Sequence, residues 1–427
     1  MGSYCEMTQQ ELRQEYEIQK KAFEACKAKG LKLDMSRGRP SKLQLDVAEE
    51  ILTAVQTADD CVDDTIDARN YGQLSGLPCA RAYWADVLGC KPEQTIVGGS
   101  ASLNLMFDVI ARAYSHGLLH SPRPWCREET VKFLCPSPGY DRHFRITEFF
   151  GAQLITVPMK NDGPDMDMVE QLVRDPQVKG IWCVPKYSNP DGIIYSEQTI
   201  RRIASLRCAA PDFLVMWDNA YCVHEFEGEY VEFPDIISLC AQYGNPDMVM
   251  EFASTSKITF AGGGISVIAA SEANIAYLLK LLGVQTISYD KVNQIRHVRY
   301  LKDKANTLQI MKRHALLLQP KFSAVSDALE DEIAPLNIAR WNRPTGGYFV
   351  SLHAMPGTAK RTLALCKEAG VVMTDAGATF PYGKDPEDSN IRIAPSLPPV
   401  EDLRMAMEVF CTCLKLSALE KLLQTSN

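Results

Sequence analysis

Polar side chains that can do chemistry stand at the ends of three short apolar runs of the sequence. Asn189 follows GIWCVP, Asp218 ends FLVMWD with Tyr221 three residues later, and Lys257 follows MVMEFAS. Lysine becomes a nucleophile for a carbonyl carbon when its amine loses a proton. A buried carboxylate stabilises a neighbouring positive charge, and amide and phenol groups donate hydrogen bonds. The set is therefore an amide, a carboxylate with a phenol, and a lysine beside hydroxyl groups.

This combination matches the chemical needs of pyridoxal 5'-phosphate (PLP). The aldehyde of that cofactor requires an unprotonated lysine amine, which Lys257 supplies. Its pyridine nitrogen must stay protonated for the ring to act as an electron sink, and Asp218 suits that role. Asn189 and Tyr221 are candidates for the groups that hold the phenolic oxygen. Each residue alone is more often structural, and it is their joint order that points to the cofactor.

The remaining parts of such a ligand also have candidate partners. A helix that follows TIVGG (95–99) begins with small residues, and helix N-termini bind phosphate through free N–H groups. The predicted phosphate ligands are Ser100, Ala101, Ser102 and Ser254, and Ser256 is also predicted to bind the cofactor. An amino-acid substrate needs a planar, bidentate partner for its α-carboxylate, and Arg392 in NIRIAP (390–395) is the candidate.

Short apolar runs that alternate with helical segments position these residues. From residue 95 to residue 271 this alternation predicts a mostly parallel sheet with helices on both faces. Such sheets bind ligands outside the carboxyl ends of their strands, where the polar residues stand. A long helical region (about 290–332) follows, and then GGYFVSLHA, a helix at 358–369, VVMTDA, NIRIAP and a closing helix predict a small α+β unit.

Three divisions of the chain follow from this pattern. Residues 1–45 are expected to form an N-terminal helix (8–29) and an irregular segment (33–44) that belong to the small domain and cover the site. Residues 46–310 are expected to form the large cofactor-binding domain, and residues 311–427 the small C-terminal α+β domain.

The motifs resemble those of the fold-type-I PLP-dependent aminotransferases and occur in the same order. The matching strings are NYGQLSGLPCAR (70–81), NPDG (189–192), DNAY (218–221), STSK (254–257) and NIRIAP (390–395). RGRPS, SPGYDRHF, SKITFAGGG and KVNQIRHVRYL further resemble a divergent, mostly bacterial branch of aspartate aminotransferases, subgroup Ic. The similarity extends from about residue 30 to the C-terminus, over nine-tenths of the chain.

The resemblance implies a role for each matching residue. Lys257 would carry the cofactor as a Schiff base and move a proton between the substrate Cα and the cofactor, and Arg392 would bind the α-carboxylate, near Asn189. Tyr140 would stack on the ring. Tyr71 would reach the phosphate of the neighbouring subunit's cofactor, which implies a homodimer with shared sites. Gly38 and Arg37 would lie in a mobile segment that covers the substrate.

Two positions depart from the family pattern. The family usually has an arginine eight residues after the lysine, where it grips the phosphate, and this chain has Ile265 there. Another cation or backbone N–H groups must replace it. The arginine that recognises the distal carboxylate of a dicarboxylic substrate is not fixed by a motif either. The candidates are Arg37, Arg39, Arg296 and Arg299.

Composition excludes several other classes of protein. With 46% hydrophobic and 23% charged residues the 427-residue chain has an ordinary globular composition, and its net charge of −8 argues against a nucleic-acid binder. The polar N-terminus lacks a secretory signal, so the 14 cysteines are expected to be reduced and the protein cytoplasmic. No membrane segment is expected. His116 and His120 have helical spacing but stand at a helix end, so no metal site is expected.

The expected reaction is a ping-pong transamination that converts L-aspartate and 2-oxoglutarate to oxaloacetate and L-glutamate. The residues alone support only an α-amino acid with PLP, because the carbanion at Cα has several fates. The alternatives are therefore a PLP-dependent β-lyase or decarboxylase, or an aminotransferase with another amino donor. A binding protein that retains the fold and a nicotinamide oxidoreductase are weaker alternatives. The first conflicts with the intact Lys257, Asp218 and Arg392, and the second lacks a phosphate loop.

Overall fold

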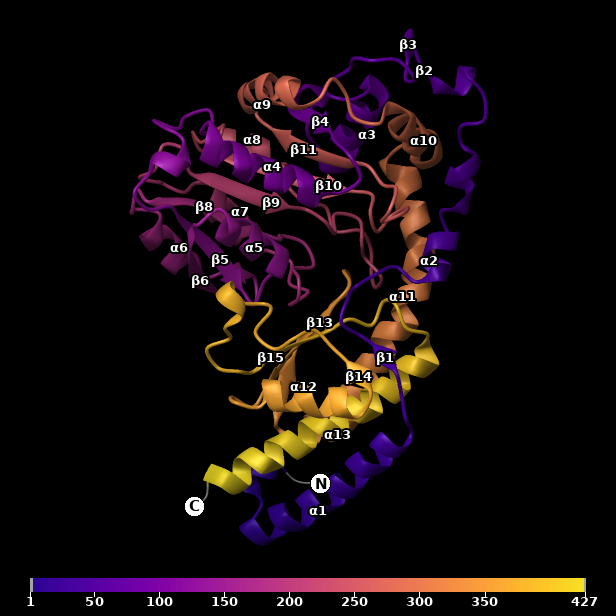
Figure 1. Ribbon diagram of the computed structural model, residues 1–427, viewed down its shortest axis with the longest axis vertical. Coiled ribbons are helices and arrows are strands. Elements are labelled where there is room, and N and C mark those ends of the chain that lie inside the picture. The colour runs from indigo at the N-terminus through magenta and orange to yellow at the C-terminus, as the bar shows by residue number, and fades with distance from the viewer. Residues whose placement is uncertain (1–2, 426–427) are drawn as a thin grey trace.

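The computed structural model describes residues 3–425 and has a large sheet at one end and a small sheet at the other (Figure 1). Residues 1–2 and 426–427, which the expected domains include, lie outside the described part. The large sheet has eight strands in the order β4 (Thr95–Val97), β11 (Ser266–Ala270), β10 (Val249–Ser254), β9 (Leu214–Asp218), β8 (Val178–Cys183), β5 (Lys132–Ser137), β6 (Gln153–Lys160) and β7 (Gly163–Pro164). The α/β fold with a mostly parallel sheet is confirmed.

Alternate residues of the central strands pack on opposite faces of the large sheet. Trp217 of β9 lies in one apolar core and Met216 in the other, because successive strand side chains point to opposite sides. One face is covered by α4 (Ser102–Ser115), α5 (Asp141–Phe149) and α9 (Glu272–Gln285). The other is covered by α3 (Pro78–Leu88), α6 (Met166–Leu172), α7 (Glu197–Ala204), α8 (Ile236–Gln242) and α10 (Lys291–Leu301).

The direction of β11 differs from that of the strands beside it. It runs antiparallel to both β10 and β4, whereas β10, β9, β8, β5 and β6 are parallel. Only residues 255–265 join β10 to β11, too few for the helical crossover that a parallel connection requires. The carboxyl ends of β4, β8, β9 and β10 therefore share one edge, and the segment after β10 is free to carry Lys257.

The small sheet and both ends of the chain form a separate apolar core. The sheet has the order β12 (Ala339–Trp341), β13 (Val350–Ala354) and β15 (Asn390–Ile393), all antiparallel. Around it pack α1 (Gln9–Ala28), α11 (Lys304–Glu332), α12 (Ala359–Glu368) and α13 (Val400–Thr425). α11 contributes to this core and to that of the large sheet, so the boundary expected at residues 310 and 311, still a prediction, falls inside one continuous helix.

The segment 33–44 is more ordered than its sequence suggests. The expectation of an irregular segment is wrong for β1 (Leu33–Asp34), which pairs with β14 (Val371–Val372), and for the start of α2 (Lys42–Asp46). The strand partner is more than 300 residues away, so no local pattern reveals it. Residues 62–67 form a small antiparallel hairpin of β2 (Val62–Asp63) and β3 (Ile66–Asp67).

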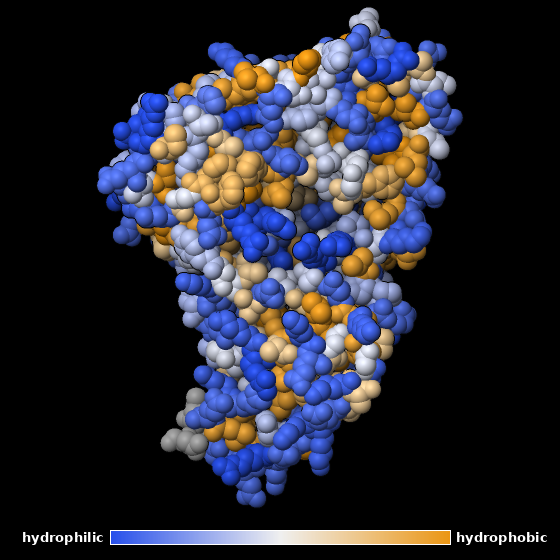
Figure 2. Space-filling view, in the orientation of Figure 1, coloured by the Kyte–Doolittle hydropathy of each residue, from blue (hydrophilic) through white to orange (hydrophobic). Residues whose placement is uncertain are grey.

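A hollow opens in the surface between the large and the small sheet, with strongly hydrophilic residues around it (Figure 2). Within residues 3–425, no helix is long and apolar enough to cross a membrane.

Candidate functional site

Lys257 lies three residues beyond the end of β10, half-buried against aromatic rings. Its Nζ is 4.8 Å from the centre of the Tyr221 ring and 5.8 Å from that of Tyr348. Burial lowers the pKa of the Lys257 amine, and the negative charge of Asp218 partly opposes this effect. The amine therefore loses its proton more readily than an exposed lysine, as a nucleophile requires.

Asp218, at the carboxyl end of β9, is buried, and only one of its two carboxylate oxygens has a hydrogen-bond partner. Its Oδ2 lies 2.8 Å from His143 Nε2, which must be the donor because a carboxylate only accepts. The imidazole of His143 in turn stacks on Trp182, with ring centres 4.4 Å apart and planes 8° apart. The other oxygen, Oδ1, is buried and has no hydrogen-bond partner. A buried carboxylate oxygen of this kind is costly unless a ligand supplies a donor.

Asn189 contacts Arg392, and Tyr221 lies beside Lys257. The Oδ1 atom of Asn189 accepts a hydrogen bond from Arg392 Nη1 at 3.2 Å, which leaves its Nδ2 as the group that can donate to a ligand. Burial raises the pKa of the Tyr221 hydroxyl well above its ordinary value, and the charge of Asp218 adds to the shift. Tyr221 therefore remains a hydrogen-bond donor at neutral pH.

Arg392, in the middle of β15, is the cation of this site. Besides Asn189, its Nη1 contacts Asp141 Oδ1 at 3.2 Å, and its Nε and Nη2 lie 3.4 Å from Thr374 Oγ1. The guanidinium carbon is 4.9 Å from the centre of the Phe349 ring. A guanidinium that is buried on several sides and held by weak, long contacts can exchange them for a carboxylate.

The segment that contains Gly38 lies directly on this arginine's neighbours. A Cβ at Gly38 would stand 2.6 Å from Cζ of Phe349, so no other residue fits there without displacing the ring. Thr374 Oγ1 donates to the carbonyl of Ser36 at 2.6 Å. Arg37 and Arg39, on either side of Gly38, are exposed. The structure thus brings the backbone that carries Arg37 and Arg39 against Phe349 and Thr374, which contact Arg392 more than 350 residues later in the chain.

The expected phosphate ligands from two different strand ends come together. Ser254 Oγ donates to Ser256 Oγ at 3.0 Å, and Ser256 Oγ donates to the carbonyl of Ser100 at 3.3 Å. Ala101 precedes α4 in extended conformation, and Ser102 is the first helical residue, so the N-terminus of α4 opens next to these hydroxyls. We call Ser100, Ala101, Ser102, Ser254 and Ser256 the serine cradle.

The structure brings one of two further predicted residues to the site and leaves the other exposed on the surface. Tyr140 precedes α5, and its ring meets His143 edge-on, with centres 4.9 Å apart. Burial and the nearby charges of Asp218 and Asp141 raise the pKa of Tyr140 to about 12. The side chain of Tyr71 is 82% exposed in the single chain.

Sequence reasoning missed three residues that complete this arrangement: His143, Phe349 and Thr374. His143 had a usable signal, since it lies three residues after Tyr140, in the first turn of the helix that follows Tyr140. Phe349 and Thr374 had none, because only the folding of the small sheet against residues 36–39 brings them to Arg392.

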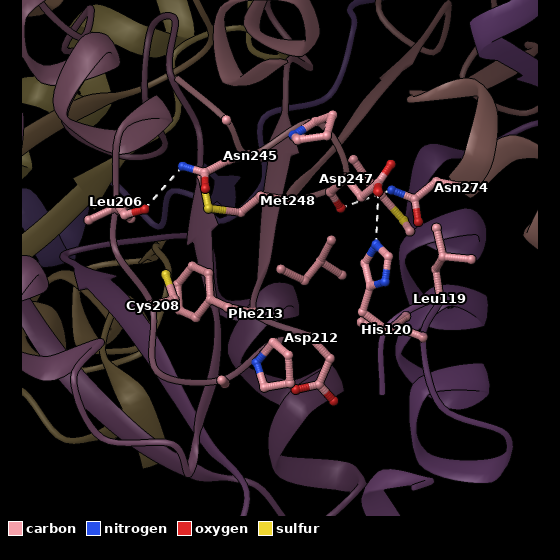
Figure 3. A pocket seen from close by; sticks show the side chains of 17 residues that line it. Leu119, His120, Leu206, Cys208, Asp212, Phe213, Asn245, Asp247, Met248 and Asn274 are labelled. Atoms are coloured by element: carbon pink, nitrogen blue, oxygen red, sulfur yellow. Dashed lines mark hydrogen bonds and ion pairs between the residues drawn. The ribbon is translucent and has the colours of Figure 1, made fainter. Parts of the chain in front are cut away.

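Another pocket, of about 340 Å³, lies at the opposite edge of the large sheet, where β9 and β10 begin (Figure 3). Its polar groups bond to one another: His120 Nε2 lies 2.8 Å from Asp247 Oδ2, and Asn274 Nδ2 donates to the Asp247 carbonyl at 2.9 Å (Figure 3). The site at the carboxyl ends, in contrast, holds a carboxylate oxygen without a partner.

Comparisons with known proteins agree with this geometry. The model of the aspartate amino-transferase family matches residues 7–426. An aspartate aminotransferase of Corynebacterium glutamicum is 48% identical over 94% of this chain and 93% of its own length. The crystal structure of an aspartate transaminase from the same organism has a TM-score of 0.95 at 47% identity, covering 96% of this chain and 97% of that one.

A more distant neighbour shares the fold and holds a ligand. The α-aminoadipate aminotransferase of Thermus thermophilus, complexed with N-(5'-phosphopyridoxyl)-L-leucine, has a TM-score of 0.73 at 20% identity and covers 91% of this chain and 93% of that one. With the family match over nearly the whole chain, these findings show that the protein belongs to the aspartate aminotransferase family of fold-type-I enzymes and is an aminotransferase whose cofactor is pyridoxal phosphate.

Proposed function

We propose that the site between the two sheets transaminates L-aspartate with 2-oxoglutarate, and that Lys257 is its catalytic lysine. The observation that carries the proposal is the buried, unpartnered Oδ1 of Asp218 near an amine of lowered pKa. A protonated pyridine nitrogen is a donor of the kind that this oxygen lacks. The residues present therefore fit PLP.

The roles of the residues follow from their contacts. Asp218, oriented by His143, holds the positive charge of the ring nitrogen, and Nδ2 of Asn189 with the hydroxyl of Tyr221 donates to the phenolic oxygen. Tyr140 covers one side of the ring, and the serine cradle binds the phosphate. When bound, the cofactor accepts the electron pair that the substrate Cα–H bond leaves behind. Lys257 is the group that takes this proton from Cα and returns it to the cofactor, because burial lowers the pKa of its amine and makes it a better base at neutral pH.

The two substrates share one binding mode in this proposal. Arg392 exchanges its long contacts to Thr374 and Asp141 for the α-carboxylate of either acid. Arg37, next to the Gly38 that packs on Phe349, binds the distal carboxylate in this proposal, with Arg39 as its alternative. Arg299 is less suited because it pairs with Asp60 at 3.2 Å. Because amino donor and 2-oxo acid use the same groups, they bind in turn, and the kinetics are ping-pong.

A second copy of the chain completes the proposed site. Tyr71 is a large phenol that is 82% exposed, and its segment 70–76 leads to Leu77, whose N–H bonds to Gln294 at 2.8 Å. In a homodimer this phenol donates to the phosphate of the partner subunit's cofactor. The serine cradle then receives a donor that a single chain does not provide.

A direct assay tests the proposal. Purified protein with added PLP is mixed with L-aspartate and 2-oxoglutarate, and glutamate formation is followed at several fixed concentrations of the second substrate. The expected result is glutamate with parallel double-reciprocal lines. Cofactor absorbance without glutamate would refute the transaminase proposal. Pyruvate and ammonia from a β-substituted amino acid, without an oxo-acid acceptor, would indicate the β-lyase alternative.

Replacement of Arg392 by lysine is expected to raise KM for the amino donor. A lysine keeps the charge but loses the planar fork that binds a carboxylate twice, and loss of one charged hydrogen bond weakens binding by roughly 10–100-fold. The measurement is KM and kcat for both substrates. Arg404, exposed on α13, gives the matched control, since Arg404→Lys makes the same change far from the site. An unchanged KM in Arg392→Lys would show that the carboxylate binds elsewhere.

A further inference from the structure

The serine cradle contains no cation of its own. The phosphate group of the cofactor carries nearly two negative charges at neutral pH, since the second pKa of a phosphate ester is about 6. The cradle offers hydroxyls and backbone N–H groups, and the position eight residues after Lys257 is the buried, apolar Ile265. A second positive charge besides Lys257 has to come from another element of the fold.

Arg296, in the middle of α10, is a cation without an anionic partner. Its Nη2 donates to Asn293 Oδ1, but its Nε is buried and makes no hydrogen bond. No carboxylate in residues 3–425 forms an ion pair with it. A buried guanidinium N–H without an acceptor is costly, and an anionic ligand removes that cost. Arg296 therefore has a buried N–H group that an anionic ligand, rather than a residue of the protein, can bind.

Asn293 connects this guanidinium to the segment that follows Lys257. Its Nδ2 donates to the carbonyls of Gly263 and Gly264, at 3.1 and 2.9 Å. Gly264 in turn backs directly on the serine cradle, because a Cβ there would lie 3.3 Å from the carbonyl oxygen of Ser100. The side chain of Asn293 and the backbone of Gly264 thus connect Arg296 to Ser100 of the cradle.

The direction of the side chain agrees with this connection. Side chains of a helix lean toward its N-terminus, and the bond from Arg296 to Asn293, one turn earlier, shows this direction. The N-terminal end of α10 also lies at the cradle, where a Cβ at Gly99 would stand 3.9 Å from the ring of Tyr289. The guanidinium extends toward the end of the helix that borders Gly99, the residue before Ser100.

We propose that Arg296 is the cationic partner of the cofactor's phosphate group, carried by α10 instead of by the strand after Lys257. The inference rests on the proposed function, because it takes the serine cradle to be the phosphate site. Arg299, three residues later on the same helix, provides a matched comparison. Its charge already pairs with Asp60 at 3.2 Å, and it is exposed.

The test compares ligands with and without the phosphate. The full-length chain, freed of cofactor, is titrated with PLP and with pyridoxal, and binding is followed by visible absorbance. Arg296→Met is expected to weaken PLP by roughly 10–100-fold, the effect of one charged hydrogen bond, and to leave pyridoxal unchanged. Arg296→Lys should restore part of the loss, since it returns the charge without the fork. Arg299→Met should change neither affinity.

Three outcomes would overturn the inference. Equal weakening of PLP and pyridoxal would mean that Arg296 only supports the fold, and unchanged affinity for PLP would mean that another cation binds the phosphate. Dissociation of subunits in sedimentation, with PLP affinity intact, would mean that Arg296 pairs with a carboxylate of a second copy. Failure of the proposed function is separable, because the unmodified chain would then show no absorbance band that depends on Lys257.

Discussion

Replacement of Lys257 by alanine is expected to lower the rate of transamination by at least about 10⁴-fold, the upper range for loss of a proton-transfer group, and to remove the visible absorbance of the bound cofactor. The variant loses both the amine that attaches the cofactor and the base that moves the Cα proton. Its fold should persist, because a partly buried, desolvated amine contributes little to stability. The measurements are the steady-state rate, the absorbance spectrum and the midpoint of thermal unfolding.

One further variant separates the amine from its charge, and another serves as a control. Lys257→Arg retains the positive charge, but a guanidinium does not lose its proton, so activity should stay as low as in the alanine variant. Lys280→Ala, exposed on α9, is the matched control and should behave as the unmodified chain. A visible cofactor band that survives in Lys257→Ala would contradict the proposed attachment.

The second large effect is expected for Asp218→Asn. A neutral amide cannot hold the charge of the ring nitrogen, and loss of one partner of a buried charged pair costs about 3–5 kcal/mol, or roughly 10²–10⁴-fold in rate. The loss should appear in kcat more than in KM, because Asp218 contacts neither substrate carboxylate in the proposed arrangement. A cofactor analogue with an N-methylated, permanently charged ring should recover activity in the variant. Retention of activity within tenfold would refute this role.

The same substitution makes a prediction about pH. Burial lowers the pKa of Lys257, and the negative charge of Asp218 opposes that shift. Removal of the charge therefore lowers the pKa of Lys257 further, and the free amine persists to lower pH. In Asp218→Asn the pH at which cofactor-free protein begins to react with an added aldehyde should shift downward. An upward shift would show that the two groups do not interact as the structure indicates.

The sequence by itself determined the order of strands and helices and the edge where the polar residues gather. Alternating apolar runs and amphipathic segments are local properties, and in a parallel sheet they place the residue after each strand at the same edge. The placement of Asp218 at the end of β9 and of Lys257 just after β10 follows from this alone. The reversed direction of β11 was also open to inference, from the short connection before it.

Only the tertiary structure decided which side chains meet. His143 contacts Asp218 across 75 residues, Arg392 contacts Asn189 across 203, and Gly38 packs on Phe349 from the other end of the chain. The free N–H of Arg296 likewise becomes visible only when every neighbour is in place. Local periodicity fixes which face of an element is apolar, but many packings satisfy that pattern, and partners distant in sequence are selected by the fit of whole elements.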